Sequence, residues 1–224
     1  MAVDAKSSVV IFYNFRNGLL KNGQRIYNIF VLTVRLIRRM YMNDKFFKLP
    51  LEKQRRIINA AYKVFSENSY KKAPMSEIAD ESGISKSLLF HYFTNKKELY
   101  MYLWANAIEV TRKAVTEYKT LETDDFFEML KRSLLSKCSL MRDYPHLYAF
   151  SLRAYYETAP EIQNSIQENY NNVSKASKMT VFEKIDISKF RKDIDIKTMY
   201  AEIFYAVDGY AEKISFKLYY TRRN

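Results

Sequence analysis

Residues 75–100 constrain this chain more than any other stretch, because their spacing predicts two short helices joined by a tight turn. The first helix is expected to open near Ser76 and to carry the small residue Ala79 on its inner face. Gly83 follows four residues later, where the chain needs a positive φ to leave the helix. This arrangement predicts a helix-turn-helix, whose second helix enters the major groove of DNA. The alternative is a surface helical hairpin in an unrelated bundle.

The second helix has a cap, a buried face and an exposed face. Ser85 can accept a backbone N–H at its start, with Lys86 as its first residue. Leu89 and Phe93 lie four residues apart and are expected to point into a core. The opposite face mixes charge, hydroxyl, imidazole and aromatic groups, which suit phosphates and base edges.

Nine residues are therefore the candidates for DNA contact. Ser76 and Ser85 lie at the two helix starts. Phosphate contacts are expected from Lys86, Tyr92 and Lys96. Base edges are expected to face Ser87, Leu88, Phe90 and His91.

Residues 54–100 resemble the N-terminal domain of the tetracycline-repressor (TetR) family. The family's first-helix pattern is matched by Ile57, Ala60, Ala61, Val64 and Phe65. Its second signature is matched by Glu77, Ile78, Ala79, Gly83, Ser85, Lys86, Leu89, His91, Phe93, Lys96 and Leu99. The resemblance implies an all-α, dimeric transcription regulator with a C-terminal domain that binds a small molecule and releases DNA.

The chain departs from the family pattern on the DNA side. The family's frequent Thr or Ser before the second helix is replaced by Ala73, Pro74 and Met75, so Ser76 is expected to cap that helix instead. The frequent Tyr at position 90 is Phe90, which keeps the ring but lacks the hydroxyl.

Composition agrees with an all-α protein of one domain or two small ones. Among 224 residues, Gly and Pro occur four times each, and apolar residues recur at helical spacing. A net charge of +12 favours a polyanionic partner, although a generally basic proteome would also explain it. Cys138 is the single cysteine, which excludes an intrachain disulfide and favours a reducing cytoplasm.

We divide the chain into a basic leader (1–42), a three-helix DNA-binding domain (43–98) and a helical ligand-binding and dimerisation domain (99–224). The leader holds half of the net charge and an apolar patch that is too short, and too charged at Arg35, to span a membrane. It also lacks the order of a signal peptide. We expect Met42 to be the natural start, so that 1–41 are not native; a basic amphipathic helix on DNA or membrane is the alternative.

Five further helices are expected in the C-terminal half, at 95–120, 124–143, 145–157, 159–180 and 194–220. Asn95 is expected to cap the first of them. Family members usually add one more helix for dimerisation, whereas this chain stops at Asn224. The final helix is therefore short or absent, or the chain is truncated.

A small-molecule pocket among these helices is expected from their apolar and polarisable residues. The candidate lining residues are Trp104, Ile108, Phe127, Leu130, Leu134, Cys138, Met141, Leu147, Tyr148, Phe150, Tyr155, Tyr156 and Phe204. An aromatic share of 16% favours a flat, apolar or cationic effector. Ordinary bundle core is the alternative for each residue.

Sequence motifs for catalysis and metal binding are missing. His91 belongs to the recognition helix, and His146 has no ligand-spaced partner. No phosphate-binding glycine loop or nucleophile elbow occurs. We therefore expect no enzyme, metal or cofactor, but a repressor that binds a palindromic operator as a homodimer and responds to an unknown effector. The alternatives are a DNA-binding regulator without an effector and a basic membrane-surface protein.

Overall fold

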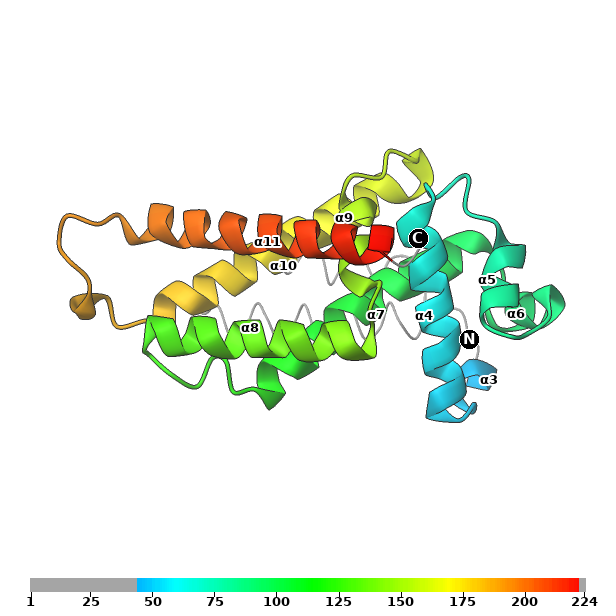
Figure 1. Cartoon of the computed structure of the whole chain (residues 1–224), viewed down its shortest axis with the longest axis horizontal. Coiled ribbons are helices and arrows are strands. Elements are labelled where there is room, and N and C mark those ends of the chain that lie inside the picture. Colours follow the sequence, from blue (N-terminus) through cyan, green and yellow to red (C-terminus); the bar gives the residue numbers. More distant parts are fainter. Residues whose placement is uncertain (1–43, 222–224) are drawn as a thin grey trace, which may run out of the picture.

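The structure is a computed structural model that describes residues 44–221, without the side chains of residue 208 and residues 210–221. All regular elements in this part are helices, which confirms the predicted all-α class (Figure 1). They are α3 (Asp44–Phe47), α4 (Leu51–Glu67), α5 (Met75–Glu81), α6 (Lys86–Tyr92), α7 (Lys96–Glu117), α8 (Phe126–Asp143), α9 (Leu147–Tyr155), α10 (Pro160–Lys184), the 3-10 helix η1 (Ile187–Lys189) and α11 (Ile196–Thr221). The expectations for residues 1–42 lie outside the described residues.

The helices expected in the C-terminal half are present as α7 to α11, with small shifts at their ends. Asn95 caps α7, because its side chain accepts the Glu98 N–H at 2.9 Å. Asp125 caps α8 in the same way, through the Glu128 N–H at 2.9 Å. Pro160 is the first residue of α10, where its missing N–H costs no helical hydrogen bond. Local cap chemistry therefore placed these helix starts to within two residues.

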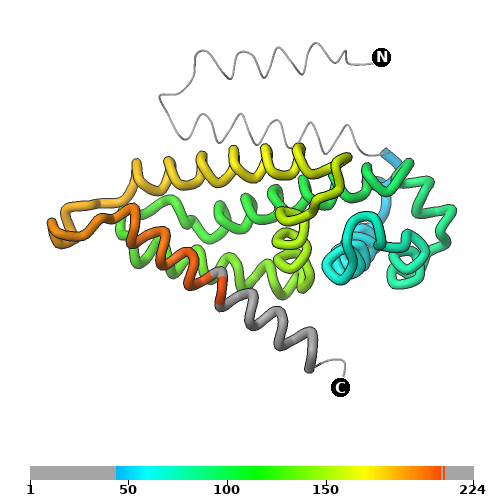
Figure 2. Tube along the Cα trace, turned by 90° about the horizontal axis from the view of Figure 1, so that it is seen from above, coloured from blue at the N-terminus to red at the C-terminus, as the bar shows by residue number. Residues whose placement is uncertain are grey.

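The molecule is elongated, with the N-terminal helices gathered at one end (Figure 1). Helices α3 to α6 form this end, and α7 leads from it into the C-terminal half. From above, α11 turns back from the far end of α10 and diverges from it (Figure 2). None of the described helices is long and apolar enough to cross a membrane. The recognition elements thus occupy one tip of a long helical body.

Two separate hydrophobic clusters hold the helices together. The proximal core joins α3 to α7 with α9 and the start of α10, and its largest fully buried side chains are Phe46, Tyr62, Phe65, Phe93, Tyr100, Tyr102 and Phe150. The distal cluster joins α8, α10 and α11 around the buried residues Phe126, Met129, Val181 and Ile185.

The proximal core is continuous across the boundary expected at residue 98, which falls in the first turn of α7. The buried Tyr62 hydroxyl of α4 donates to the Leu103 carbonyl at 2.9 Å and accepts from the Asn106 side chain at 3.1 Å. Both partners belong to α7, so the helix-turn-helix is fixed rigidly to the helix that leads into the C-terminal half.

Candidate nucleic-acid interface

The turn between α5 and α6 has the geometry that the sequence predicts. Gly83 adopts φ +63°, a left-handed conformation that costs a glycine little. The Ile84 N–H then bonds to the Ala79 carbonyl at 3.0 Å and closes the end of α5. A Cβ built on Gly83 would meet nothing within 4 Å, so backbone conformation, and not lack of space, requires glycine here.

Helix α5 is held against α4 by polar contacts at its C-terminal end. The Arg56 guanidinium donates to the Ser82 carbonyl at 2.9 Å. Lys63 pairs with Glu81 at 2.6 Å, and the Ser82 hydroxyl donates to the Ala79 carbonyl. Ala79 itself is buried. These contacts orient α5 so that α6 follows it at a fixed angle.

Helix α6 begins and packs as predicted. The Ser85 hydroxyl accepts the Leu88 N–H at 3.1 Å and so caps the helix, whose first residue is Lys86. Leu89 and Phe93 are fully buried in the proximal core. One face of α6 is therefore fixed inside the protein while the other is free to meet a partner.

The exposed face of α6 carries most of the predicted DNA-contacting residues. Exposed side chains on this face belong to Ser85, Lys86, Ser87, Phe90 and His91. Phe90 leaves 38% of its surface open. Figure 1 shows α6 at the tip of the molecule, away from the C-terminal helices. A cation, hydroxyls, an imidazole and an aromatic ring thus share one accessible helix face of a size that fits the major groove.

Tyr92 lies in the core and not on the exposed face, which corrects its predicted role as a phosphate contact. Its side chain is 6% exposed, and its ring packs edge-on against Phe46 with 5.7 Å between ring centres. Residue 92 lies three positions after Leu89 and therefore shares part of its buried face. Leu88 is also half-buried and packs against the proximal core, so only part of its side chain could face a base.

Ser76 does not cap α5, contrary to prediction. The N-cap position is Pro74, which makes no side-chain cap hydrogen bond, and Ser76 is exposed inside the first turn. The helix starts two residues earlier than a Ser76 cap predicts, because proline fixes φ in a range compatible with a helix start. Ser76 still lies at the end of α5 where the sequence placed it.

Lys96 is held by the protein itself. Its ammonium donates to the carbonyls of Tyr70 and Lys71, both at 3.1 Å, and lies 5.7 Å from the Tyr70 ring centre. Burial lowers the pKa of this ammonium below its ordinary value. Two of its three N–H groups are thus used inside the protein, which leaves one for a phosphate.

Sequence reasoning missed the loop between α4 and α5, residues 68–74. It carries Lys71 and Lys72, both exposed, and leads directly into α5. Two consecutive lysines just before a helix-turn-helix were the sequence feature that could have indicated a DNA contact. Whether these lysines reach DNA depends on where the loop is held, which the sequence does not show.

The residues predicted to line an effector pocket are not brought together. Phe150 and Trp104 are buried in the proximal core. Phe127 (67% exposed), Leu134 and Cys138 instead lie exposed along α8, and Phe204 lies partly exposed on α11. The remaining candidates are half-buried apart from the buried Leu147 and the exposed Tyr156: Ile108, Leu130, Met141, Tyr148 and Tyr155. Helical spacing alone does not distinguish an outward apolar face from a pocket lining, which is why this prediction was wrong as a single site.

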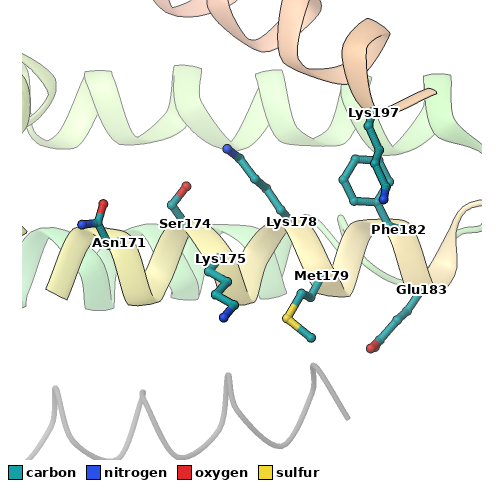
Figure 3. A pocket seen from close by; sticks show the side chains of 8 residues that line it. All are labelled: Asn171, Ser174, Lys175, Lys178, Met179, Phe182, Glu183 and Lys197. Atoms are coloured by element: carbon teal, nitrogen blue, oxygen red, sulfur yellow. The ribbon is translucent and has the colours of Figure 1, made fainter. Parts of the chain in front are cut away.

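A different, open groove of about 630 Å³ runs along α10 and the start of α11 (Figure 3). Its lining contains none of the predicted pocket residues and consists of Asn171, Ser174, Lys175, Lys178, Met179, Phe182, Glu183 and Lys197. Among the described residues, no group of three or more His, Cys, Asp or Glu side chains is placed to hold a metal ion.

Comparisons with known proteins identify the N-terminal helices at this end of the molecule as similar to a family of DNA-binding regulators. The family model for bacterial regulatory proteins of the tetR family matches residues 57–103, which run from α4 into α7. The crystal structure of a TetR family transcriptional regulator from Chloroflexus aurantiacus J-10-fl superposes with a TM-score of 0.56 at 26% identity, over 75% of this chain and 76% of that one. Residues 57–103 therefore carry the N-terminal domain of the TetR family, and the chain as a whole is similar to TetR family regulators.

Two curated proteins that are similar to this chain regulate transcription in opposite directions, one as an activator and the other as a repressor. The HTH-type transcriptional activator FasR of Mycolicibacterium smegmatis is 33% identical over 79 residues, which cover 35% of this chain and 36% of FasR. The HTH-type transcriptional repressor AcnR of Corynebacterium efficiens is 18% identical over 170 residues, covering 74% of this chain and 84% of AcnR. The match to FasR thus spans about a third of that protein.

Proposed function

We propose that this protein is a transcriptional repressor that binds a palindromic DNA operator as a homodimer. The observation that carries the proposal is the exposed face of α6, which is capped by Ser85 and fixed from behind by Leu89 and Phe93. Lys86 would hold a phosphate, while Ser87, Phe90, His91 and the open part of Leu88 would face base edges. Such a regulator acts where bacterial DNA lies, in the cytoplasm.

Exposed apolar residues on α8 and α11 support the homodimer. Phe127, Leu134 and Leu135 of α8 are 67%, 39% and 47% exposed, and Phe204 and Tyr205 of α11 are 36% and 73% exposed. Lys137 of α8 lies 4.8 Å from the Phe204 ring centre, which places the two groups beside each other. A second copy covering this face would remove its apolar surface from water. To enter successive major grooves, the two α6 helices of such a dimer would have to lie about 34 Å apart.

The DNA-binding proposal is tested by selecting duplexes from a random-sequence library with the purified full chain. We expect a palindromic consensus, and His91→Ala should weaken binding to it by about 1–3 kcal/mol and relax base preference at one position. Lys86→Ala should weaken binding to all duplexes alike and lower the salt dependence by about one counterion. Failure of the unaltered chain to bind any duplex would contradict the proposal.

Release by a small-molecule effector is the second part of the proposal, and the groove along α10 supports it. Its lining includes three lysines, Lys175, Lys178 and Lys197, and the apolar side chains of Met179 and Phe182, on both sides of α10 (Figure 3). This combination suits a ligand with an anionic group and an apolar body. A thermal-shift series of alkyl carboxylates, with the matching neutral alcohols as controls, tests it: a ligand that binds the folded state raises the Tm.

A regulator that lacks an effector is the competing function, and the dispersal of the predicted pocket residues favours it. In that case the chain would bind its selected duplex with an affinity that no small molecule changes. The two functions are separated by repeating the duplex titration with every compound that raises the Tm. A Tm shift without loss of DNA binding would favour the regulator without an effector.

A further inference from the structure

Loop 68–74 presents two lysines beside the helix-turn-helix. The loop is a compact turn in which the N–H groups of Lys72 and Ala73 both donate to the Ser69 carbonyl, at 3.0 and 2.9 Å. The side chains of Lys71 and Lys72 are exposed, whereas the Tyr70 ring between α4 and the lysines is buried. The loop therefore has a defined shape, with its cations on the outer surface.

A carboxylate from the C-terminal half holds the loop, in addition to the Lys96 ammonium that bonds the Tyr70 and Lys71 carbonyls. Glu157 lies between α9 and α10, and one of its oxygens accepts the Tyr70 N–H at 2.6 Å across 87 residues of sequence. Its other oxygen accepts the N–H groups of Thr158 and Ala159, at 3.0 and 3.2 Å. Glu157 is only 9% exposed, and a buried carboxylate is tolerated because three backbone donors replace its water. The single side chain thus joins two loops.

Further bonds fix α9 to α4 on either side of this bridge. The Arg153 guanidinium donates to the Ser66 carbonyl at 2.9 Å, close to the end of α4. Ahead of α9, the Asn59 amide of α4 donates to the carbonyl of Asp143, the last residue of α8, at 3.0 Å. The Phe150 ring lies 5.1 Å from the ring centres of both Tyr62 and Tyr100. Helix α9 lies beside α4 (Figure 1), so a shift of the α9–α10 connection would pull directly on loop 68–74.

We propose that Glu157 is a positioning residue for DNA binding, which holds loop 68–74 where Lys71 and Lys72 reach a DNA phosphate. The inference rests on the proposed DNA-binding function. It also accounts for a departure from the family pattern, since Ala73, Pro74 and Met75 offer no hydroxyl before α5. The two lysines supply the phosphate contact in its place, and Glu157 connects that contact to the C-terminal half.

A double-mutant cycle on the full chain tests the proposal, with a duplex selected by the unaltered chain as the probe. Glu157→Gln keeps the size of the side chain but replaces one acceptor oxygen by an NH₂ donor. This donor would face backbone N–H groups, so the hydrogen bonds to one of the two loops would be lost. Replacing Lys71 and Lys72 together by Ala should weaken binding of the unaltered chain about tenfold and lower the salt slope by roughly two. In the Glu157→Gln background the same replacement should change affinity less than about threefold, because the lysines are already displaced.

A merely structural role for Glu157 makes a different prediction. Partial unfolding would reduce DNA binding by a constant factor, so the effects of Glu157→Gln and of the lysine replacement would multiply. Multiplying effects would overturn the proposal. Glu168→Gln, an exposed change on α10, is the matched control and should leave both affinity and coupling unaltered.

A second variant and a second measurement keep the test valid if Glu157→Gln folds poorly. Glu157→Asp keeps the charge but is one methylene too short to reach both loops, and it should show the same loss of coupling. Amide hydrogen exchange should quicken at Tyr70 in either variant while the middle of α10 keeps its protection. Unchanged exchange at Tyr70 would also contradict the proposal.

The same experiments distinguish failure of this inference from failure of the proposed function. If the unaltered chain binds no duplex, the proposed function fails. If it binds a duplex and the effects of the two replacements multiply, only this inference fails.

Discussion

The proximal core and the distal cluster differ in how completely they bury their apolar side chains. Around the helix-turn-helix, seven aromatic residues lie at 0% exposure and contact one another edge-on or tilted. In the distal cluster, four of the side chains that the structure describes are buried, and the neighbouring Phe127, Leu134 and Leu135 are exposed. The DNA-binding end thus buries its aromatic side chains within one chain, whereas the distal end leaves apolar surface exposed, which is the surface assigned to the proposed dimer.

Truncation of one aromatic residue in each cluster tests this difference most strongly. Phe65→Ala should destabilise the protein by about 3–5 kcal/mol, because the side chain is fully buried and its neighbours cannot collapse into the space. Phe126→Ala, in the distal cluster, should have a clearly smaller effect in dilute monomeric protein, because fewer buried side chains surround it there. Urea unfolding of both variants provides the measurement. Equal losses would contradict the contrast between the clusters.

A charge placed on the exposed face of α8 should break the proposed dimer. Leu134→Glu is expected to weaken self-association by about 2 kcal/mol or more, since an unpaired carboxylate would be buried at the interface. Light scattering coupled to size exclusion measures the change in mass. Leu51→Glu, at an exposed leucine (79%) that begins α4, is the control and should leave the mass unaltered. Equal behaviour of the two variants would place the interface elsewhere.

Two buried tyrosines of the proximal core should respond in opposite ways to loss of their hydroxyls. Tyr62→Phe removes a hydroxyl with two hydrogen-bond partners and should destabilise by about 1–3 kcal/mol. The Tyr100 hydroxyl is buried without a partner among the described residues, so Tyr100→Phe should be neutral or stabilise by about 1 kcal/mol. Thermal unfolding of both variants measures the signs, and a large loss from Tyr100→Phe would show that this hydroxyl is satisfied.

Tyr100 should also make the stability of the protein depend on pH in the alkaline range. Burial, and secondarily the nearby Glu157, raises the pKa of Tyr100 well above its ordinary value, and burial also raises that of Tyr70. The unfolded chain loses these protons near pH 10 while the folded chain retains them, so stability should fall as pH rises above about 10. Tyr100→Phe should make this fall shallower, which urea midpoints between pH 9 and about 11 would show.

The smallest expected effects concern two helix ends with positive φ. Gly83→Ala should cost about 1 kcal/mol, because alanine is strained at φ +63° although space is open around it. Lys119, just after α7, has φ +51° with a side chain, so Lys119→Gly should stabilise by up to about 1 kcal/mol. Thermal unfolding compares them. The same sign for both changes would show that backbone conformation is not the controlling factor.

Most predictions based on local chemistry were confirmed by the structure, although the predicted Ser76 cap was wrong. Ser85 and Asn95 cap their helices, Gly83 has the expected φ, and Leu89 and Phe93 are buried. Each of these depends on residues within a few positions of one another. The predicted role of Tyr92 and the predicted pocket were wrong, because Phe46 covers the Tyr92 ring and α8 turns its apolar face outward.

The sequence by itself determined the helix-turn-helix and its likeness to the TetR family, since capping, left-handed glycine and helical spacing act within single elements. The tertiary structure decided which polar groups meet across the chain. The Tyr70 N–H finds Glu157, and the Tyr70 and Lys71 carbonyls find Lys96, through packing of distant helices. No local pattern encodes these partners, because a hydrogen bond spanning 87 residues depends on how α4, α7 and α9 share one core.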